Sequence, residues 1–227
     1  MPLNPQAGNM YSFVTHTWNP IRGLCRHDCG YCYMKRHPQK ALHFVEKEMR
    51  TDLGKGNFIF VGSSTDVFAD DVPAEWITRV LGHCRNYPGN TYLFQSKNPK
   101  RFGEFIKEYP PDAVFATTLE TNRENDLASA PSRLSRTIWM QNEWMKRKMI
   151  TIEPIMDFDV HDLMLMVIRI WPEFVNIGAD SNKMLSLPEP SAVKVKQLIA
   201  ALQKTAIKTI EKNNLSRILE GGTNVGK

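Results

Sequence analysis

Cys25-Arg26-His27-Asp28-Cys29-Gly30-Tyr31-Cys32 is the most informative stretch of this 227-residue chain. Its three cysteines follow the spacing C-x3-C-x-aromatic-C. Three thiolates can bind three irons of a cubane 4Fe–4S cluster, which leaves the fourth iron without a protein ligand. A cluster bound by four cysteines is coordinatively full and suits electron transfer, whereas an open iron can chelate a substrate or cosubstrate. The stretch therefore predicts a cluster that takes part in chemistry.

A structural zinc site is the alternative interpretation of the same cysteines. Cys84 is the fourth cysteine of the chain, and His27 and His37 are spare ligands. Structural zinc sites usually present two pairs of ligands at similar short spacing. The second pair is missing here, because Cys84 stands alone in a helical pattern, where we interpret it as a small buried apolar residue. The spacing favours the cluster over zinc.

Composition and charge limit the class of protein. With 42% hydrophobic residues the chain can bury a core, and no apolar run approaches the length of a membrane span. Residues 1–5 lack the pattern of a secretion signal, and clustered cysteines indicate ligands, so we expect a cytoplasmic protein with no membrane partner. The net charge of +5, concentrated in residues 22–36, 97–101 and 133–148, fits a polyanionic partner or an ordinary solvated surface equally well.

The order of predicted elements indicates the fold class. Strands are expected at residues 11–18, 57–62, 91–96, 113–118, 149–153 and 174–178, with 206–210 as a candidate seventh. Helices are expected at residues 34–53, 73–87, 99–108, 131–146, 160–171 and 188–204. This alternation predicts an α/β protein with a parallel sheet and crossover helices. We expect one domain over residues 1–220 and a disordered tail over residues 221–227.

Polar residues follow the predicted strands. In parallel barrels the reacting groups lie on loops at the C-terminal ends of the strands. The cysteines follow the first strand, and Gly178 after the sixth permits close approach of a ligand. The remaining candidates, in strand order, are Ser63, Ser64 and Asp66, then Lys97, then Glu120 and Asn122, then Glu153, and finally Asp180. A turn or helix cap is the alternative for the first three, and a solvated side chain for Lys97, Glu120 and Asn122. Glu153 follows a buried run, so it needs a partner or a function.

The cysteine stretch, with Tyr31 just before the third cysteine, resembles the signature of the radical S-adenosylmethionine (SAM) superfamily. Residues 15–20, 61–73, 94–99, 151–154 and 210–215 resemble segments of small radical SAM proteins associated with bacteriophages, in the same order along the chain. Residues 63–66 and 178–180 depart from that pattern, since those proteins commonly have Met-Ser-Asp and Gly-Gly-Glu-like runs there. The resemblance implies an open partial (β/α)6 barrel.

The resemblance also implies a chemistry. The open iron would chelate SAM, and an electron from the cluster would cleave SAM to methionine and a 5′-deoxyadenosyl radical, which abstracts hydrogen from a substrate. Cys25, Cys29 and Cys32 would bind the cluster. The residues implied to contact SAM or substrate are Tyr31, Ser63, Ser64, Asp66, Lys97, Glu120, Asn122, Glu153 and Asp180. Glu120 and Asn122 would meet the SAM ribose, and Lys97 a carboxylate or phosphate.

The implied substrate is a thymine-derived base in DNA or its nucleotide, which the enzyme would isomerise in a bacterium or a phage-infected host. Repair of a thymine lesion and action on a free small molecule remain open. So does a zinc-stabilised module that binds nucleic acid without catalysis. No further cysteine-rich segment is present, so we expect no second cluster. An external one-electron reductant such as a flavodoxin is then required.

Overall fold

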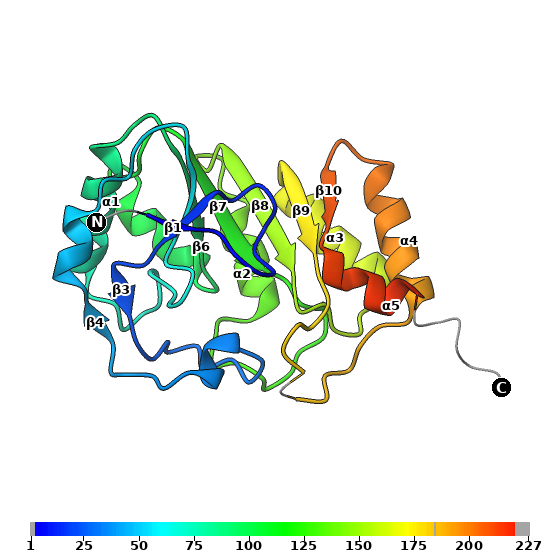
Figure 1. Ribbon diagram of the computed structural model, residues 1–227. Coiled ribbons are helices and arrows are strands. Elements are labelled where there is room, and N and C mark those ends of the chain that lie inside the picture. The colour runs from blue at the N-terminus through cyan, green and yellow to red at the C-terminus, as the bar shows by residue number, and fades with distance from the viewer. Residues whose placement is uncertain (1–2, 184, 221–227) are drawn as a thin grey trace.

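An eight-stranded sheet forms the centre of the computed structural model, which describes residues 3–183 and 185–220 (Figure 1). The strand order is β1-β2-β5-β6-β7-β8-β9-β10. β1 pairs antiparallel with β2, and every other neighbouring pair is parallel. The prediction of an α/β fold with a mostly parallel sheet is therefore confirmed, and the candidate seventh strand forms. The strand bounds are β1 (Asn4–Pro5), β2 (His16–Trp18), β5 (Phe58–Val61), β6 (Thr91–Gln95), β7 (Ala113–Thr118), β8 (Arg147–Ile152), β9 (Phe174–Ile177) and β10 (Lys208–Glu211).

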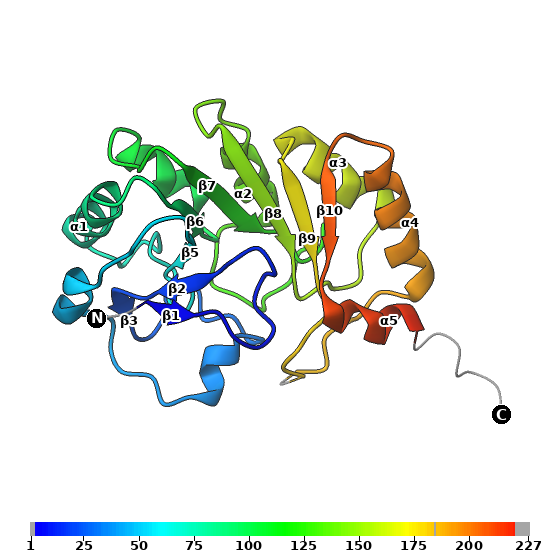
Figure 2. The same ribbon diagram turned by 45° about the horizontal axis from the view of Figure 1, so that its top comes forward.

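Helices cover the outer, convex face of the curved sheet (Figure 2). The strands alternate between two apolar layers, as the two-residue period of a strand requires. On β8, for example, Ile150 and Ile152 pack in the larger cluster with the helices, whereas Met149 belongs to a smaller cluster on the concave side. Cys84 lies fully buried in the larger cluster, as interpreted from the sequence. The helices are α1 (Ala74–Arg85), α2 (Arg133–Met140), α3 (Val160–Ile170), α4 (Ala192–Gln203) and α5 (Ser216–Glu220), with a 3₁₀ segment η3 (Pro99–Phe105).

The prediction of a helix over residues 34–53 is wrong. This segment forms two 3₁₀ turns, η1 (Tyr33–Arg36) and η2 (Glu46–Arg50), with strand β4 (His43–Phe44) between them. β4 pairs antiparallel with β3 (Ile21–Arg22). Pro38 is the fifth residue of the predicted helix, where it lacks an amide hydrogen and would clash with the preceding turn. The first crossover of the barrel therefore carries the cysteine loop in place of an α-helix.

The segment between β1 and β2 fills the concave side of the sheet. Tyr11 and Val14 are buried in the smaller apolar cluster, and the ring of Phe13 lies 5.0 Å from the rings of both Phe58 and Phe174. Phe58 belongs to β5 and Phe174 to β9, so this segment bridges distant strands across the open side of the barrel. The predicted strand at residues 11–18 is accordingly shorter, because its first half is occupied by this packing.

Two predictions about the extent of the domain stay predictions. The tail at residues 221–227 lies outside the described residues, and the single domain over residues 1–220 is not tested. Among the helices of the described part of the chain, none combines the length and the apolar character that a membrane crossing needs.

Candidate active site

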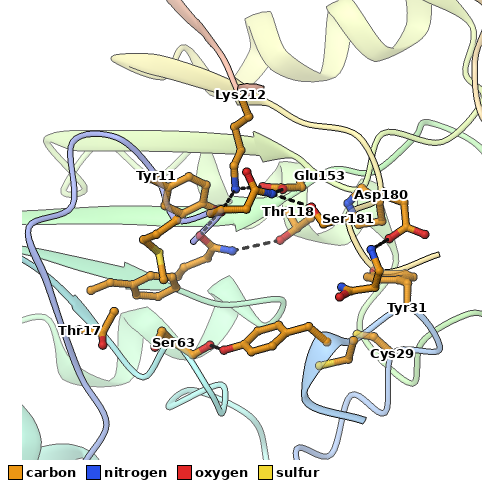
Figure 3. Close-up of a pocket in the computed structure, with 18 of the residues that line it drawn as sticks. Tyr11, Thr17, Cys29, Tyr31, Ser63, Thr118, Glu153, Asp180, Ser181 and Lys212 are labelled. Carbon is orange, nitrogen blue, oxygen red and sulfur yellow. Dashed lines mark hydrogen bonds and ion pairs between the residues drawn. The ribbon is translucent and has the colours of Figure 1, made fainter. Parts of the chain in front are cut away.

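Two adjoining cavities lie at the carboxyl ends of the parallel strands. The larger, about 640 Å³ in volume, is here called the large cavity, and the smaller, about 170 Å³, the cysteine cavity. Figure 3 shows side chains that line the large cavity. Cys29, Cys32, Ser63 and Lys97 line both, so the two cavities share a wall and connect the cysteines with the large cavity. The large cavity has the size of a typical small-molecule site.

Cys25, Cys29 and Cys32 all line the cysteine cavity. Backbone hydrogen bonds hold their loop in shape: the Asp28 amide donates to the Cys25 carbonyl at 3.1 Å, and the Cys32 amide to the Cys29 carbonyl at 3.0 Å. The Gly30 amide donates to the carbonyl of Leu127 at 2.8 Å, which anchors the loop to the segment after β7. This geometry is consistent with the sequence prediction that the three thiols belong to one ligand site.

The thiols fit metal ligands better than free nucleophiles. Burial, with the nearby Asp66 carboxylate, raises the pKa of Cys25 to about 12, and burial also raises the pKa of Cys32. A nucleophilic cysteine needs a lowered pKa, whereas a bound metal deprotonates a thiol outright. A cluster spreads its cysteines over separate irons, whereas a zinc ion needs all its sulfur ligands at about 2.3 Å. The donor set therefore fits a cluster.

Asp66 joins the cysteine loop to two strand ends. Its carboxylate lies 2.7 Å from Nε2 of His27 and accepts hydrogen bonds from the Ser96 hydroxyl and the Lys97 amide, both at 2.9 Å. Burial by itself would raise the pKa of Asp66, but the His27 and backbone hydrogen bonds outweigh burial and lower it. Every one of these contacts is internal to the protein. Asp66 lines the cysteine cavity, and its carboxylate holds the cysteine loop in position.

Tyr31, Lys97 and Glu120 form a buried network behind the cysteine loop. The Tyr31 hydroxyl donates to Glu120 Oε1, and the Lys97 ammonium donates to both of them. The second oxygen of Glu120 lies 3.3 Å from Arg133 Nε and 3.2 Å from Arg136 Nη1. The Lys97 ammonium also lies 4.8 Å from the centre of the Tyr31 ring, a cation–π contact. Three cations therefore surround one carboxylate.

The charges of this network decide its protonation. Burial alone would raise the pKa of Glu120, but Lys97, Arg136 and Arg133 outweigh burial and hold that pKa well below its usual range. Burial and the neighbouring Glu120 carboxylate raise the pKa of Tyr31, so its hydroxyl keeps its proton and donates it. Lys97 is the cation of the network that reaches both cavities.

A second carboxylate, Glu153, lies at the other end of the large cavity (Figure 3). Its Oε2 is 2.9 Å from the ammonium of Lys212, and its Oε1 accepts from the Asn9 side chain at 3.2 Å. Lys212 also donates to the Asn9 carbonyl and lies 5.0 Å from the centre of the Tyr11 ring. Asn9 follows the first strand of the sheet and Lys212 the last, so this group closes the gap between the two edges.

Gly178 makes room for Glu153 itself. A Cβ atom on Gly178 would lie 2.8 Å from Cδ and 2.9 Å from Oε1 of Glu153. The sequence predicted that this glycine would admit a ligand, and that interpretation is corrected here, because the close neighbour is a side chain of the protein. Burial raises the pKa of Glu153, and Lys212 offsets that rise only in part.

Seven of the nine predicted contact residues line a cavity, and two do not. Glu120 is fully buried in its ion network and reaches neither cavity wall. Asn122 lies in the loop after β7 and contacts the start of α3, where its side-chain oxygen accepts from the Asp159 amide at 2.8 Å. The expectation that both meet the SAM ribose stays a prediction, and in this structure their polar atoms are used within the protein. The lining residues are Tyr31, Ser63, Ser64, Asp66, Lys97, Glu153 and Asp180.

Several lining residues already have protein partners. The hydroxyls of Ser63 and Ser64 donate to the side-chain oxygen of Asn19, at 3.2 and 3.1 Å. The Asp180 carboxylate accepts from the amides of Asn182 and Lys183, at 2.9 and 3.0 Å, and so closes the turn after β9. Their contribution to a ligand site is therefore the shape of the wall, with further hydrogen bonds from the lone pairs that remain.

The sequence analysis missed the residues of the cavity that come from the N-terminal segment and from the strands themselves, including the last residues of β6 and β7. The Tyr11 hydroxyl donates to Gln95 at 2.9 Å, and Gln95 in turn lies 3.5 Å from the Thr118 hydroxyl. Lys212 follows β10, the candidate seventh strand, so the same strand-end rule applies to it. Asn9 precedes β2 and carried no signal, because its position depends on how the segment folds back across the barrel.

Solved structures with a similar fold are radical SAM enzymes. A spore photoproduct lyase mutant aligns with a TM-score of 0.64 at 8% identity, covering 91% of this chain and 78% of that chain. A spore photoproduct lyase double mutant with bound AdoMet and dinucleoside spore photoproduct aligns at 0.58 and 9%, covering 89% and 65%. Streptococcus suis SuiB bound to precursor peptide SuiA aligns at 0.62 and 11%, covering 90% of this chain and half (50%) of SuiB.

At these identities the likeness shows the fold alone: an α/β fold whose mostly parallel sheet matches radical SAM partial barrels. No curated protein matches the sequence. A family model described as "Protein of unknown function (DUF5131)" matches residues 9–183, which is most of the chain. The chain therefore belongs to the DUF5131 family.

Proposed function

We propose that this protein is a radical SAM enzyme that binds a 4Fe–4S cluster through Cys25, Cys29 and Cys32 and binds SAM in the adjoining large cavity. The observation that carries this proposal is the shared wall: Cys29 and Cys32 line both cavities. When bound, the cluster would supply the electron that cleaves SAM and starts hydrogen abstraction from the substrate. The protein's own residues bind, orient and enclose the reactants.

Lys97 is the residue best placed to bind an anionic group of SAM or of the substrate. It lines both cavities, and its side chain is only 14% exposed, so its charge acts in a poorly screened environment. Arg133 and Arg136 already compensate Glu120 from behind. Because three cations face one carboxylate, positive charge is left over for a ligand. Glu120 positions Lys97 and Tyr31 without touching the ligand.

The other end of the large cavity suits the substrate. Ser181 lines this end, and Gln95 and Thr118 line the wall that the large cavity shares with the cysteine cavity. Their amide and hydroxyl groups include both donors and acceptors. Burial raises the pKa of Glu153, so this carboxyl group takes up a proton more readily than an exposed one. A pyrimidine ring presents donors and acceptors on one edge, so this wall could bind a thymine-derived base. Tyr11 and Phe60 supply the apolar surface against which such a ring would pack.

We infer that the substrate is a thymine-derived base in DNA or its nucleotide, and that the reaction is an isomerisation. One similar structure holds a dinucleoside, which supports a nucleic-acid substrate. The basic clusters expected from the sequence support it less than anticipated. Arg101 donates to the carbonyls of Ala69 and Val72 inside the protein, and Arg147 pairs with Asp112 and Glu173.

Repair of a thymine lesion is the second candidate, and the fold likeness to spore photoproduct lyase favours it. An isomerase returns a product of unchanged mass, whereas a lyase separates two joined bases. The two candidates are therefore distinguished by the product.

The test incubates reconstituted, reduced enzyme and SAM with modified DNA from a phage and its host, followed by digestion and nucleoside mass spectrometry. We expect 5′-deoxyadenosine and a nucleoside of equal mass with a shifted retention time, together with deuterium transfer from labelled substrate. Cys29→Ala is the matched control and should form neither product. If the wild type forms 5′-deoxyadenosine but alters no DNA or nucleotide, the nucleic-acid substrate is wrong. If it forms no 5′-deoxyadenosine at all, the enzyme class is wrong.

A further inference from the structure

The outer surface of the cysteine loop carries an exposed basic segment. We call residues 24–40 the cysteine-loop surface; drawn in blue, they form part of the lower edge of the molecule in Figure 2. The segment carries four cations against one carboxylate, Asp28, and so holds three of the protein's five net positive charges. The cations are Arg26, Lys35, Arg36 and Lys40, and all four are exposed.

Two of these cations have structural partners and two are free. Lys35 lies 2.7 Å from Asp28, and Arg36 donates to the Asn182 carbonyl. Arg26 and Lys40 have no side-chain partner among residues 3–183 and 185–220. A charge that makes no contact within the fold is available to a partner.

An exposed leucine lies between the free cations. Leu24 is 59% exposed, and its amide donates to the carbonyl of Lys40 at 2.9 Å, which places the two residues side by side. Arg26 lies two residues further along the loop. An apolar contact surrounded by charges of one sign is the usual composition of a small, transient protein interface. A DNA backbone would instead favour an extended track of cations without an apolar centre.

This surface is also the outer side of the loop that bears the cysteines. Arg26 is directly bonded to Cys25, so a protein docked here would be separated from the cysteine cavity by one turn of backbone. Cys29 and Cys32 line the large cavity, but Cys25 does not. A protein docked beside Cys25 would therefore leave the large cavity free for SAM and substrate. Segment 124–129 packs on the loop through the Ser129 amide. It carries two carboxylates: Glu124, which pairs with Arg133, and Asp126.

We propose that the cysteine-loop surface docks an acidic one-electron carrier protein, with Arg26 and Lys40 as the charged contacts and Leu24 as the apolar one. The inference rests on the proposed function, because only a redox centre at the cysteines needs such a partner. In each transfer a flavin hydroquinone anion in the carrier loses one electron and becomes the neutral semiquinone, while the site at the cysteines gains that electron.

The test measures binding of a purified acidic bacterial flavodoxin to the protein by surface plasmon resonance, across a range of salt concentrations. We expect Arg26→Glu/Lys40→Glu to raise the Kd by about tenfold or more at low salt, because the surface changes from three net positive charges to one net negative. Binding by the wild type should weaken as salt rises. Lys55→Glu/Lys208→Glu is the matched control, since these lysines lie near the N-terminal ends of β5 and β10, and it should bind as the wild type does.

A second readout separates this inference from the proposed function. With dithionite as the reductant, the Arg26→Glu/Lys40→Glu variant should retain its iron and form 5′-deoxyadenosine at the wild-type rate, whereas the flavodoxin-driven rate should fall. If the variant loses iron, Lys40→Glu alone gives the test, since Lys40 is remote in sequence from the cysteines. Unchanged affinity of the variant for flavodoxin overturns the inference. A variant that loses affinity only for duplex DNA overturns it as well. A wild type that is inactive with dithionite instead counts against the proposed function.

Discussion

Glu120 and Glu153 occupy equivalent places in the fold but have opposite electrostatics. Each follows a parallel strand, β7 or β8, and each pairs with a lysine from the end of another strand. Glu120 is 0% exposed, is surrounded by three cations and has a lowered pKa. The Glu153 side chain is 18% exposed, has one cation and has a raised pKa. The number of cations, more than the depth of burial, decides the protonation of these strand-end carboxylates.

The difference assigns separate roles to the two ends of the large cavity. At the end next to the cysteines, the charge of Glu120 is fixed and its network holds Tyr31 and Lys97 in place. At the other end, Glu153 closes the barrel together with Lys212, and burial raises its pKa. Rigid positioning is what a reactive centre needs, whereas an adaptable hydrogen-bonding wall suits a substrate.

The largest effect is expected from Glu120→Ala. The substitution leaves Arg133 and Arg136 buried without their carboxylate, which should lower the free energy of unfolding by about 3–5 kcal/mol. Glu153→Ala is the matched comparison and should lower it by about 1–2 kcal/mol, because Lys212 keeps the Asn9 carbonyl and faces the cavity. Urea unfolding of both variants measures the difference. Equal losses would mean that the two networks are equivalent after all.

Gly178→Ala should disturb only the Glu153 end. The added Cβ would lie 2.8 Å from Glu153 Cδ, so the carboxylate must move, at a cost of about 1–3 kcal/mol. In the Glu153→Ala background the same substitution should cost much less, since the clashing atoms are gone. Thermal or urea unfolding of the double-mutant cycle measures this coupling, and a cost that is independent of Glu153 contradicts the assignment.

Tyr31→Phe should have a smaller effect at the Glu120 end. It removes the hydroxyl that donates to Glu120, while the three cations remain, so we expect a loss of about 1–2 kcal/mol. The cysteine loop should also become less ordered, which hydrogen exchange of residues 25–32 would detect. Tyr33→Phe is the control, because its hydroxyl donates to the Ser63 carbonyl at 2.9 Å, outside the buried network. Equal exchange in the two variants would refute a positioning role for Tyr31.

The pH dependence of stability should have opposite signs at the two ends. The pKa of Glu120 is lower in the folded than in the unfolded chain, so its stabilisation is complete above the unfolded pKa of about 4.3 and is lost as pH falls through the folded value. The folded state raises the pKa of Glu153, so its contribution to stability declines as pH rises from about 4.3 through the folded value.

Unfolding measured across pH tests this sign. Glu120→Gln should reduce the loss of stability in acid, and Glu153→Gln should remove a decline above about pH 4.3, each by no more than about 1.4 kcal/mol per pH unit. Slopes that change in the same direction in both variants would show that the two carboxylates do not differ in this way.

The parallel sheet and the strand-end location of the site could be predicted from the sequence, because local periodicity and the direction of parallel strands determine them. The strand-end rule found Lys97, Glu153 and Asp180, which line the large cavity. It did not show the ion network of Glu120, because Arg133 and Arg136 come from α2, and a sequence does not show which helix packs behind a loop. It also failed for Asn9, whose place depends on the fold of the N-terminal segment over the concave face.

The most direct test of the central claim is the iron, sulfide and electron paramagnetic resonance analysis of anaerobically reconstituted protein, with and without SAM. We predict about four irons and four sulfides per chain, and a signal from the reduced protein that changes when SAM is added. Cys29→Ala should lose the iron, whereas Cys84→Ala, with its thiol fully buried in α1, should keep both the iron and the SAM response. A colourless protein with stoichiometric zinc, or a Cys84→Ala variant as depleted as Cys29→Ala, would contradict the three-cysteine site.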